Sequence, residues 1–130
     1  MHIGIPAETR SGEKRVAATP ETVKKLTVAG HHKILVQSGA GIAASIPDSE
    51  FAASGASIAG SAAEMYAQSE IVLKVRGPEI PELAMMRKDG ILIGLLAPQQ
   101  VSPIEAYAKH GLTAFAMELI PRISRAQAMD

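Results

Sequence analysis

Residues 90–96 read Gly-Ile-Leu-Ile-Gly-Leu-Leu and belong to the longest apolar run of the chain. The run is too short for a transmembrane helix, which needs about 20 apolar residues. It has the length of a strand, and no polar residue alternates with the apolar ones. Both faces of this strand are therefore expected to be buried, as in a parallel sheet that helices cover on both sides.

Further strands are expected on either side of this run, at residues 2–6, 33–37, 56–59, 70–75 and 112–117. Helix signals separate them. The first helix is expected to begin at Thr19-Pro20 and to end at Gly30. Asp48 is expected to cap a helix that runs to Ser54, and Ser61 to cap the next helix. A loop and helix are expected over residues 78–88, and a last helix from Ser102-Pro103 to Gly111.

This alternation of strands and helices predicts an α/β fold: a three-layer, mostly parallel open sheet with flanking helices, flavodoxin- or Rossmann-like. The length of 130 residues suits one domain. Open sheets of this kind bind ligands beyond the carboxyl ends of their strands. The loops after Pro6, Lys74, Leu96 and Met117 are therefore the places where a site is expected.

Composition excludes several classes of function. Thirteen basic and thirteen acidic residues balance, and only four residues are Phe or Tyr, so a nucleic-acid partner is not expected. The absence of cysteine rules out disulfides and thiolate ligands. The N-terminus does not have the pattern of a signal peptide, and we expect a cytoplasmic location.

Two basic residues are candidates for binding an anion. Arg15 lies between the first strand and the first helix, and Lys74 lies in the strand at 70–75. Both fit the carboxyl edge of the sheet, where a guanidinium and an ammonium could hold a carboxylate or phosphate. A pair of solvated surface charges is an equally good interpretation.

Other motifs are weaker. Gly39–Ala44 has the spacing of a dinucleotide fingerprint, but Pro47 interrupts the helix that such a motif should open, which favours a plain turn. His2, His31, His32 and His110 stand at element ends with no ligand spacing, so no metal site is expected. No side chain is predicted to act as a catalytic acid, base or nucleophile.

The sequence also resembles a known family. Residues 1–20 (MHIGIPAETRSGEKRVAATP), Gln37–Gly41, Val72–Val75 with Pro78, and Gly90–Leu92 are similar, in this order, to the start of the alanine dehydrogenase and nicotinamide nucleotide transhydrogenase family. The resemblance covers essentially the whole chain. It implies that residues 1–130 are the N-terminal, truncated part of a two-domain subunit whose NAD-binding Rossmann domain lies elsewhere.

Two places separate the branches of this family. Alanine dehydrogenases carry a catalytic histidine just after the fifth strand, where this chain has Leu95–Gln99 and no histidine. The segment from Met117 to Asp130 is similar to the transhydrogenase branch. The resemblance implies that Arg122, Gln127 and Asp130 contact the nicotinamide. It also matches Arg15 and Lys74 to a carboxylate-binding pair of alanine dehydrogenases.

The resemblance therefore implies an NAD(H)-binding transhydrogenase component that passes hydride from NADH to NADP⁺. The implied partners are an NADP(H)-binding component and a membrane component that translocates protons, with a homodimer at the cytoplasmic side of the inner membrane. The chain alone is expected to be inactive. An alanine dehydrogenase-like fragment and a non-catalytic assembly domain are the alternatives.

Overall fold

The computed structural model of the protein describes residues 1–30 and 32–119. Within them, six parallel strands form one sheet in the order β3-β2-β1-β4-β5-β6. The strands are β1 (His2–Ile5), β2 (Lys33–Gln37), β3 (Ser57–Ala59), β4 (Ile71–Arg76), β5 (Ile91–Leu95) and β6 (Thr113–Ala116). The predicted α/β class and open parallel sheet are confirmed.

Short helices connect the strands. They are α1 (Pro20–Gly30), α2 (Asp48–Ala53), α3 (Ala62–Gln68), α4 (Ile80–Met85) and α5 (Val101–His110), with 3₁₀ turns η1 (Ile42–Ala44) and η2 (Met117–Leu119). The predicted caps Thr19 and Ser61 accept hydrogen bonds from backbone N–H groups three residues on, both at 3.2 Å. Gly111 ends α5 in the left-handed region, with φ at 86°.

Two predicted helix starts are wrong. Pro47, not Asp48, is the N-cap of α2, because the Asp48 carboxylate turns back to the preceding loop. Helix α5 begins at Val101 with Gln100 as its N-cap, before the predicted Ser102-Pro103. The hydroxyl of Ser102 is thus not needed as a cap, because the N-cap position lies two residues earlier.

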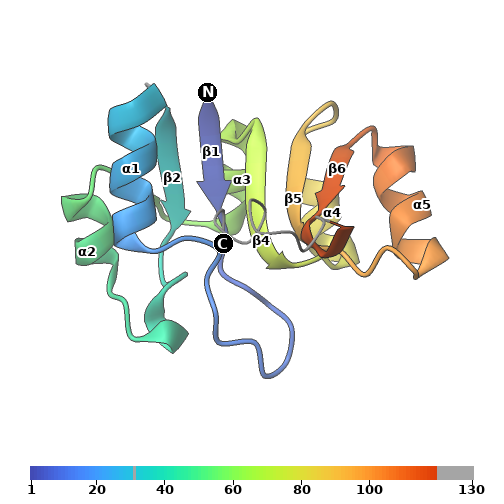
Figure 1. Ribbon diagram of the computed structural model, residues 1–130, viewed down its shortest axis with the longest axis horizontal. Helices are drawn as coiled ribbons and strands as arrows, with labels where there is room; N and C mark the ends of the chain where they lie inside the picture. Colours follow the sequence, from blue (N-terminus) through green and yellow to red (C-terminus); the bar gives the residue numbers. More distant parts are fainter. Residues whose placement is uncertain (31, 120–130) are drawn as a thin grey trace.

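The chain starts in the middle of the sheet and builds it outward in two directions. From β1 it moves to β2 and β3, and then it crosses back to β4, β5 and β6. All strands run the same way, so their carboxyl ends form one edge, which we call the carboxyl edge (Figure 1). The loop between β1 and α1 hangs from this edge.

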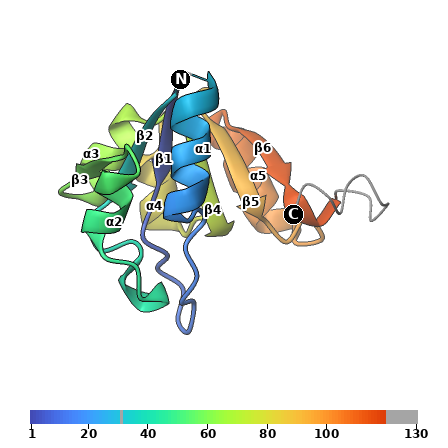
Figure 2. The ribbon, with the colours of Figure 1, turned by 60° about the vertical axis from the view of Figure 1, so that its left-hand side comes forward.

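Helices α1 and α2 cover one face of the sheet, whereas α3, α4 and α5 contribute to the core on the other. Close packing of α3 requires Gly4 in β1, because a Cβ atom there would lie 2.0 Å from the Ser69 hydroxyl. No helix of the described residues covers β5 and β6 on the α1 side (Figure 2). Phe115 of β6 is consequently 55% exposed.

Candidate functional site

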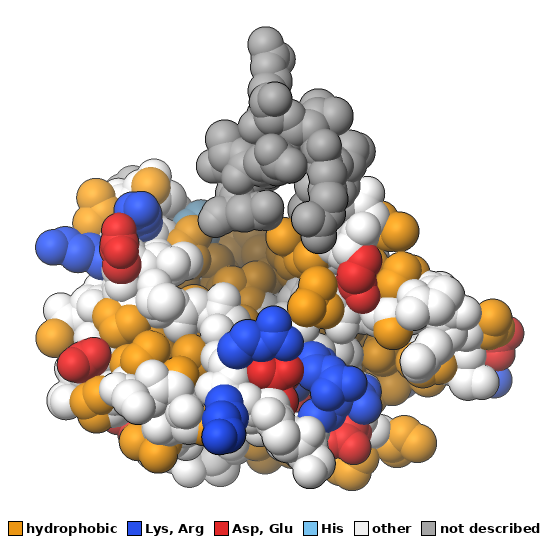
Figure 3. All heavy atoms as spheres, turned by 60° about the horizontal axis from the view of Figure 1, so that its bottom comes forward, with side chains coloured by type: hydrophobic (Ala, Val, Ile, Leu, Met, Phe, Trp, Pro, Cys, Tyr) orange, Lys and Arg blue, Asp and Glu red, His pale blue; other side chains and the backbone are white. Residues whose placement is uncertain are grey.

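The carboxyl edge carries a group of basic side chains with acidic ones between them (Figure 3). A hollow of about 390 Å³ opens here beside β4 and β5. Both predicted anion-binding residues, Arg15 and Lys74, line it, together with Met117 from η2. The two residues thus border the same hollow, although their side chains bind different partners.

Lys74 is buried, which contradicts its interpretation as a solvated charge. Its side chain is only 1% exposed, and its ammonium Nζ lies 2.8 Å from the Glu82 carboxylate and 3.4 Å from that of Glu8. Glu8 in turn accepts hydrogen bonds from the backbone N–H groups of Val75 and Arg76. The Lys74 ammonium is thus neutralised inside the protein by two carboxylates.

Glu82 is the centre of this cluster. Its carboxylate accepts hydrogen bonds from the Tyr66 hydroxyl at 2.9 Å, the Thr9 hydroxyl at 3.0 Å and the Glu79 N–H at 3.0 Å. Burial opposes its ionisation, but these donors and Lys74 outweigh it, so the pKa of Glu82 lies below its ordinary value. Burial and the adjacent Glu82 charge raise the pKa of Tyr66.

Arg15 differs from Lys74 because it lies at the surface. Its side chain is 64% exposed. Its Nε and Nη2 groups donate to the two oxygens of Glu13 at 2.8 and 2.9 Å. This hydrogen bonding lowers the pKa of Glu13 to about 2. Any anion that binds Arg15 has to share it with Glu13.

Sequence reasoning missed Glu8, Glu82 and Tyr66. Glu8 follows β1 by three residues, which is a usual place for a site residue in such a sheet. The only sequence feature that marks Glu82 is its place as an acidic residue in the first turn of a helix. Tyr66 lies in α3 with no local motif. Only the fold shows that all three side chains meet at Lys74.

The segment after β5 contains no titratable side chain in this structure. Leu96 is buried, and Ala97 has a positive φ of 49°. Their N–H groups donate to the Glu118 carboxylate of η2 at 3.0 and 2.7 Å. Burial tends to raise the pKa of Glu118, but hydrogen bonds from backbone N–H groups hold it below its ordinary value.

The segment Gly39–Ala44 does not form a phosphate-binding loop. Its N–H donor at Gly39 and the Ser38 hydroxyl both bind the Asp48 carboxylate, at 2.9 and 2.7 Å. The turn leads into the three-residue η1 and not into a long helix. The predicted plain turn is therefore what the structure has.

Two of the histidines that the structure describes make ordinary contacts at element ends, whereas Nδ1 of His32 is buried without a hydrogen-bond partner among the described residues. His2 Nδ1 lies 3.3 Å from Glu70, and His110 Nε2 lies 2.7 Å from the Met86 carbonyl oxygen. Residues 1–30 and 32–119 contain no cluster of His, Asp and Glu suited to a metal ion. In the same ranges no helix is long and apolar enough to cross a membrane.

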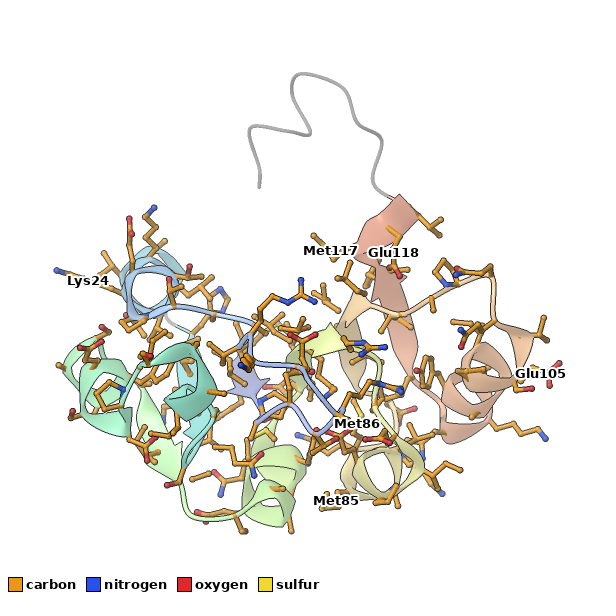
Figure 4. The ribbon with its side chains drawn as sticks, turned by 90° about the horizontal axis from the view of Figure 1, so that it is seen from below. Lys24, Met85, Met86, Glu105, Met117 and Glu118 are labelled. Atoms are coloured by element: carbon orange, nitrogen blue, oxygen red, sulfur yellow. The ribbon has the colours of Figure 1, made fainter. Side chains whose placement is uncertain are left out.

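The tail residues Arg122, Gln127 and Asp130, like His31, lie outside the described residues. The described chain ends in η2, whose Met117 and Glu118 lie on the α1 side of the sheet, opposite Met85 of α4 and the C-cap Met86 (Figure 4). Of η2, Met117 lines the 390 Å³ hollow.

Comparison with known proteins gives a consistent result. The profile of the family described as alanine dehydrogenase/PNT, N-terminal domain, matches residues 4–130. The chain is 45% identical over 136 aligned positions to the first part of NAD(P) transhydrogenase subunit alpha from Rhodospirillum rubrum, with 100% of this chain and 35% of that protein covered.

Two solved structures have the same fold. The transhydrogenase from Sinorhizobium meliloti superposes with a TM-score of 0.94 and 40% identity over 100% of this chain and 39% of that chain. An L-alanine dehydrogenase superposes with a TM-score of 0.88 and 32% identity over 97% of this chain and 34% of that one. The chain spans about a third of the length of these relatives.

Proposed function

The chain belongs to the alanine dehydrogenase/PNT N-terminal domain family, and from this premise we propose that it is the N-terminal part of the NAD(H)-binding subunit of a transhydrogenase. The reaction is hydride transfer from NADH to NADP⁺, which yields NAD⁺ and NADPH. The transhydrogenase names of R. rubrum and S. meliloti proteins support this choice within the family.

The observation that carries the proposal is the structure after β5. Reduction of a 2-oxo acid needs a proton donor beside the carbonyl oxygen, whereas hydride transfer between two nicotinamide rings needs only alignment and exclusion of water. Leu96 and Ala97 supply no proton donor from their side chains, and their N–H groups already bind Glu118. This arrangement fits transhydrogenation better than alanine dehydrogenation.

The described residues do not by themselves fit a dinucleotide. The one candidate for a phosphate-binding loop, at Gly39–Ala44, has its N–H donor at Gly39 occupied by Asp48. We therefore assign the pyrophosphate of NAD(H) to the rest of the subunit. Arg122, Gln127 and Asp130 are proposed to hold the nicotinamide end, with Gln127 at the carboxamide and the guanidinium of Arg122 orienting the ring.

The wider assignment follows from the same proposal. An NADP(H)-binding component would accept the hydride, and a membrane component would couple the reaction to proton translocation. The subunit would act as a homodimer on the cytoplasmic side of the inner membrane. The apolar surface on the α1 side of β6, where Phe115 is exposed, is consistent with a domain that packs against further chain.

The test uses the full natural polypeptide that carries this chain, mixed with an NADP(H)-binding component. We expect hydride transfer from NADH to NADP⁺. Gln127→Leu should lower its rate by about tenfold to a hundredfold, because misplacing the ring costs rate more than binding, and NADH affinity should change little. Gln68→Leu, at the exposed end of α3, is the matched control and should leave the rate unchanged.

Three results would contradict the proposal. Oxidation of NADH that depends on pyruvate and ammonium would identify an alanine dehydrogenase. A rate that Gln127→Leu and Gln68→Leu leave equally intact would remove Gln127 from the site. Absence of both reactions would favour the non-catalytic assembly domain.

A further inference from the structure

A second, smaller hollow of about 120 Å³ lies at the carboxyl ends of β4 and β5, against the start of α5. Arg10 and Arg76 line it from different segments, and Gln100 and Tyr107 line it from α5 and its N-cap. None of its lining residues is acidic. It is therefore a small cationic pocket, separate from the Lys74 cluster.

Tyr107 supplies a further donor at this pocket. The residue is only 3% exposed. Its hydroxyl makes no hydrogen bond within residues 1–30 and 32–119, and it is not among the fully buried atoms without a partner, so it lines the pocket as an available donor. The hydroxyl rests against Gly77, where a Cβ atom would lie 2.4 Å from it. Burial raises the pKa of Tyr107 while the nearby Arg10 charge opposes the rise, so the hydroxyl is a donor at neutral pH.

Both arginines keep N–H groups that can donate hydrogen bonds to a ligand. Arg10 is fixed in place, because its Nε and Nη2 groups donate to the Gly77 carbonyl oxygen at 3.1 and 2.8 Å, and its Nη1 group has no such bond. The Arg76 guanidinium makes no ion pair with any described residue. The backbone donors nearest the pocket, at Leu96 and Ala97, bind Glu118 and are not available.

We propose that this pocket binds a phosphate group through Arg10, Arg76, Gln100 and Tyr107. Two guanidinium groups match the double charge of phosphate, and their N–H groups suit its oxygens. A hollow of this size holds a few water molecules or one phosphate group. It adjoins a hollow of about 490 Å³ that Arg10, Pro103 and Tyr107 also line. The site is independent of the proposed transhydrogenase function, which assigns it no role.

The experiment is a calorimetric titration of inorganic phosphate into the full natural polypeptide. Arg76→Gln removes one charge from an exposed position and should weaken phosphate binding by about tenfold or more, since charge-assisted hydrogen bonds are strong. Tyr107→Phe removes only the hydroxyl and should weaken it by a smaller factor. Arg87→Gln is the matched control, because Arg87 lines a different hollow together with Met1 and Gly90.

The outcomes separate the sources of the phosphate. AMP that binds as tightly as inorganic phosphate, with the same loss in Arg76→Gln, supports a site for a phosphate on a larger molecule. Inorganic phosphate that binds while AMP does not supports a site for the free ion. Undetectable phosphate binding, equal binding of acetate, or equal loss in Arg87→Gln and Arg76→Gln overturns the proposal.

Discussion

Lys74 and Arg76 lie two residues apart on β4, yet they have opposite environments. Lys74 is buried between the carboxylates of Glu8 and Glu82, whereas Arg76 is exposed and lines a pocket without an acidic residue. Each is accompanied by a buried tyrosine. The Tyr66 hydroxyl donates to Glu82, and the Tyr107 hydroxyl has no partner among the described residues.

The comparison shows that the presence of a basic residue at the carboxyl edge does not by itself indicate whether it has a structural or a ligand-binding role. A cation that protein carboxylates saturate has a structural role, because its removal leaves those carboxylates buried without a counter-charge. A cation with unused donors is available to a ligand. The pairing of β4 with β5 shifts register between Leu73 and Arg76, so the regular alternation of side chains is interrupted there and the two residues have different neighbours.

The largest effect is expected from removing the saturated cation. Lys74→Met leaves two buried carboxylates without a counter-charge and should lower the free energy of unfolding by about 3–5 kcal/mol. Arg76→Met, at the exposed position, should change it by no more than about 0.5 kcal/mol. Urea unfolding of both variants measures the difference, and equal losses would refute the contrast between the two environments.

Lowering the pH should also reduce the free energy of unfolding, by part of the amount expected for Lys74→Met. The folded-state pKa of Glu82 lies below its ordinary value of 4.5, so the Glu82 contribution is fully present above about pH 4.5 and is lost as the pH falls through the folded-state pKa. Glu82→Gln should flatten the decline of stability below pH 4.5. Glu105→Gln, on the exposed side of α5, should leave the decline as steep as in the natural chain, and thermal unfolding between neutral and acidic pH tests both.

The smallest contrast concerns the two tyrosines. Tyr66→Phe removes a hydrogen bond to a charged carboxylate and should cost about 1.5–3 kcal/mol. Tyr107→Phe removes a hydroxyl without a protein partner and should change stability by no more than about 0.5 kcal/mol. A cost for Tyr107→Phe as large as that for Tyr66→Phe, in the absence of phosphate, would show that the Tyr107 hydroxyl has a structural partner.

Local signals predicted most of the fold. The strand at Lys33–Gln37 was predicted to the residue, and the caps Thr19, Ser61 and Gly111 act as their residue types indicate. These features depend on a few neighbouring residues, so the sequence contains them directly. Asp48 shows the limit of such signals, because an acidic residue suits a helix start and a loop contact equally.

The candidate site was predicted less completely. Placing Arg15 and Lys74 at one edge required only the parallel order of strands. The partners of Lys74 could not be predicted, because Glu8 and Glu82 are far apart in the sequence and carry no joint pattern. The roles of Arg122, Gln127 and Asp130 rest on family resemblance, and the structure does not describe these residues.

The sequence by itself determined the class of fold and the family, because apolar runs, caps and ordered motifs are properties of short segments. Only the tertiary structure decided which basic side chains are paired with carboxylates inside the protein and which keep N–H donors available to a ligand. Burial and hydrogen bonding depend on neighbours that arrive from distant segments, and these neighbours set both the cost of a charge and its availability. Lys74 and Arg76, two residues apart, differ for this reason alone.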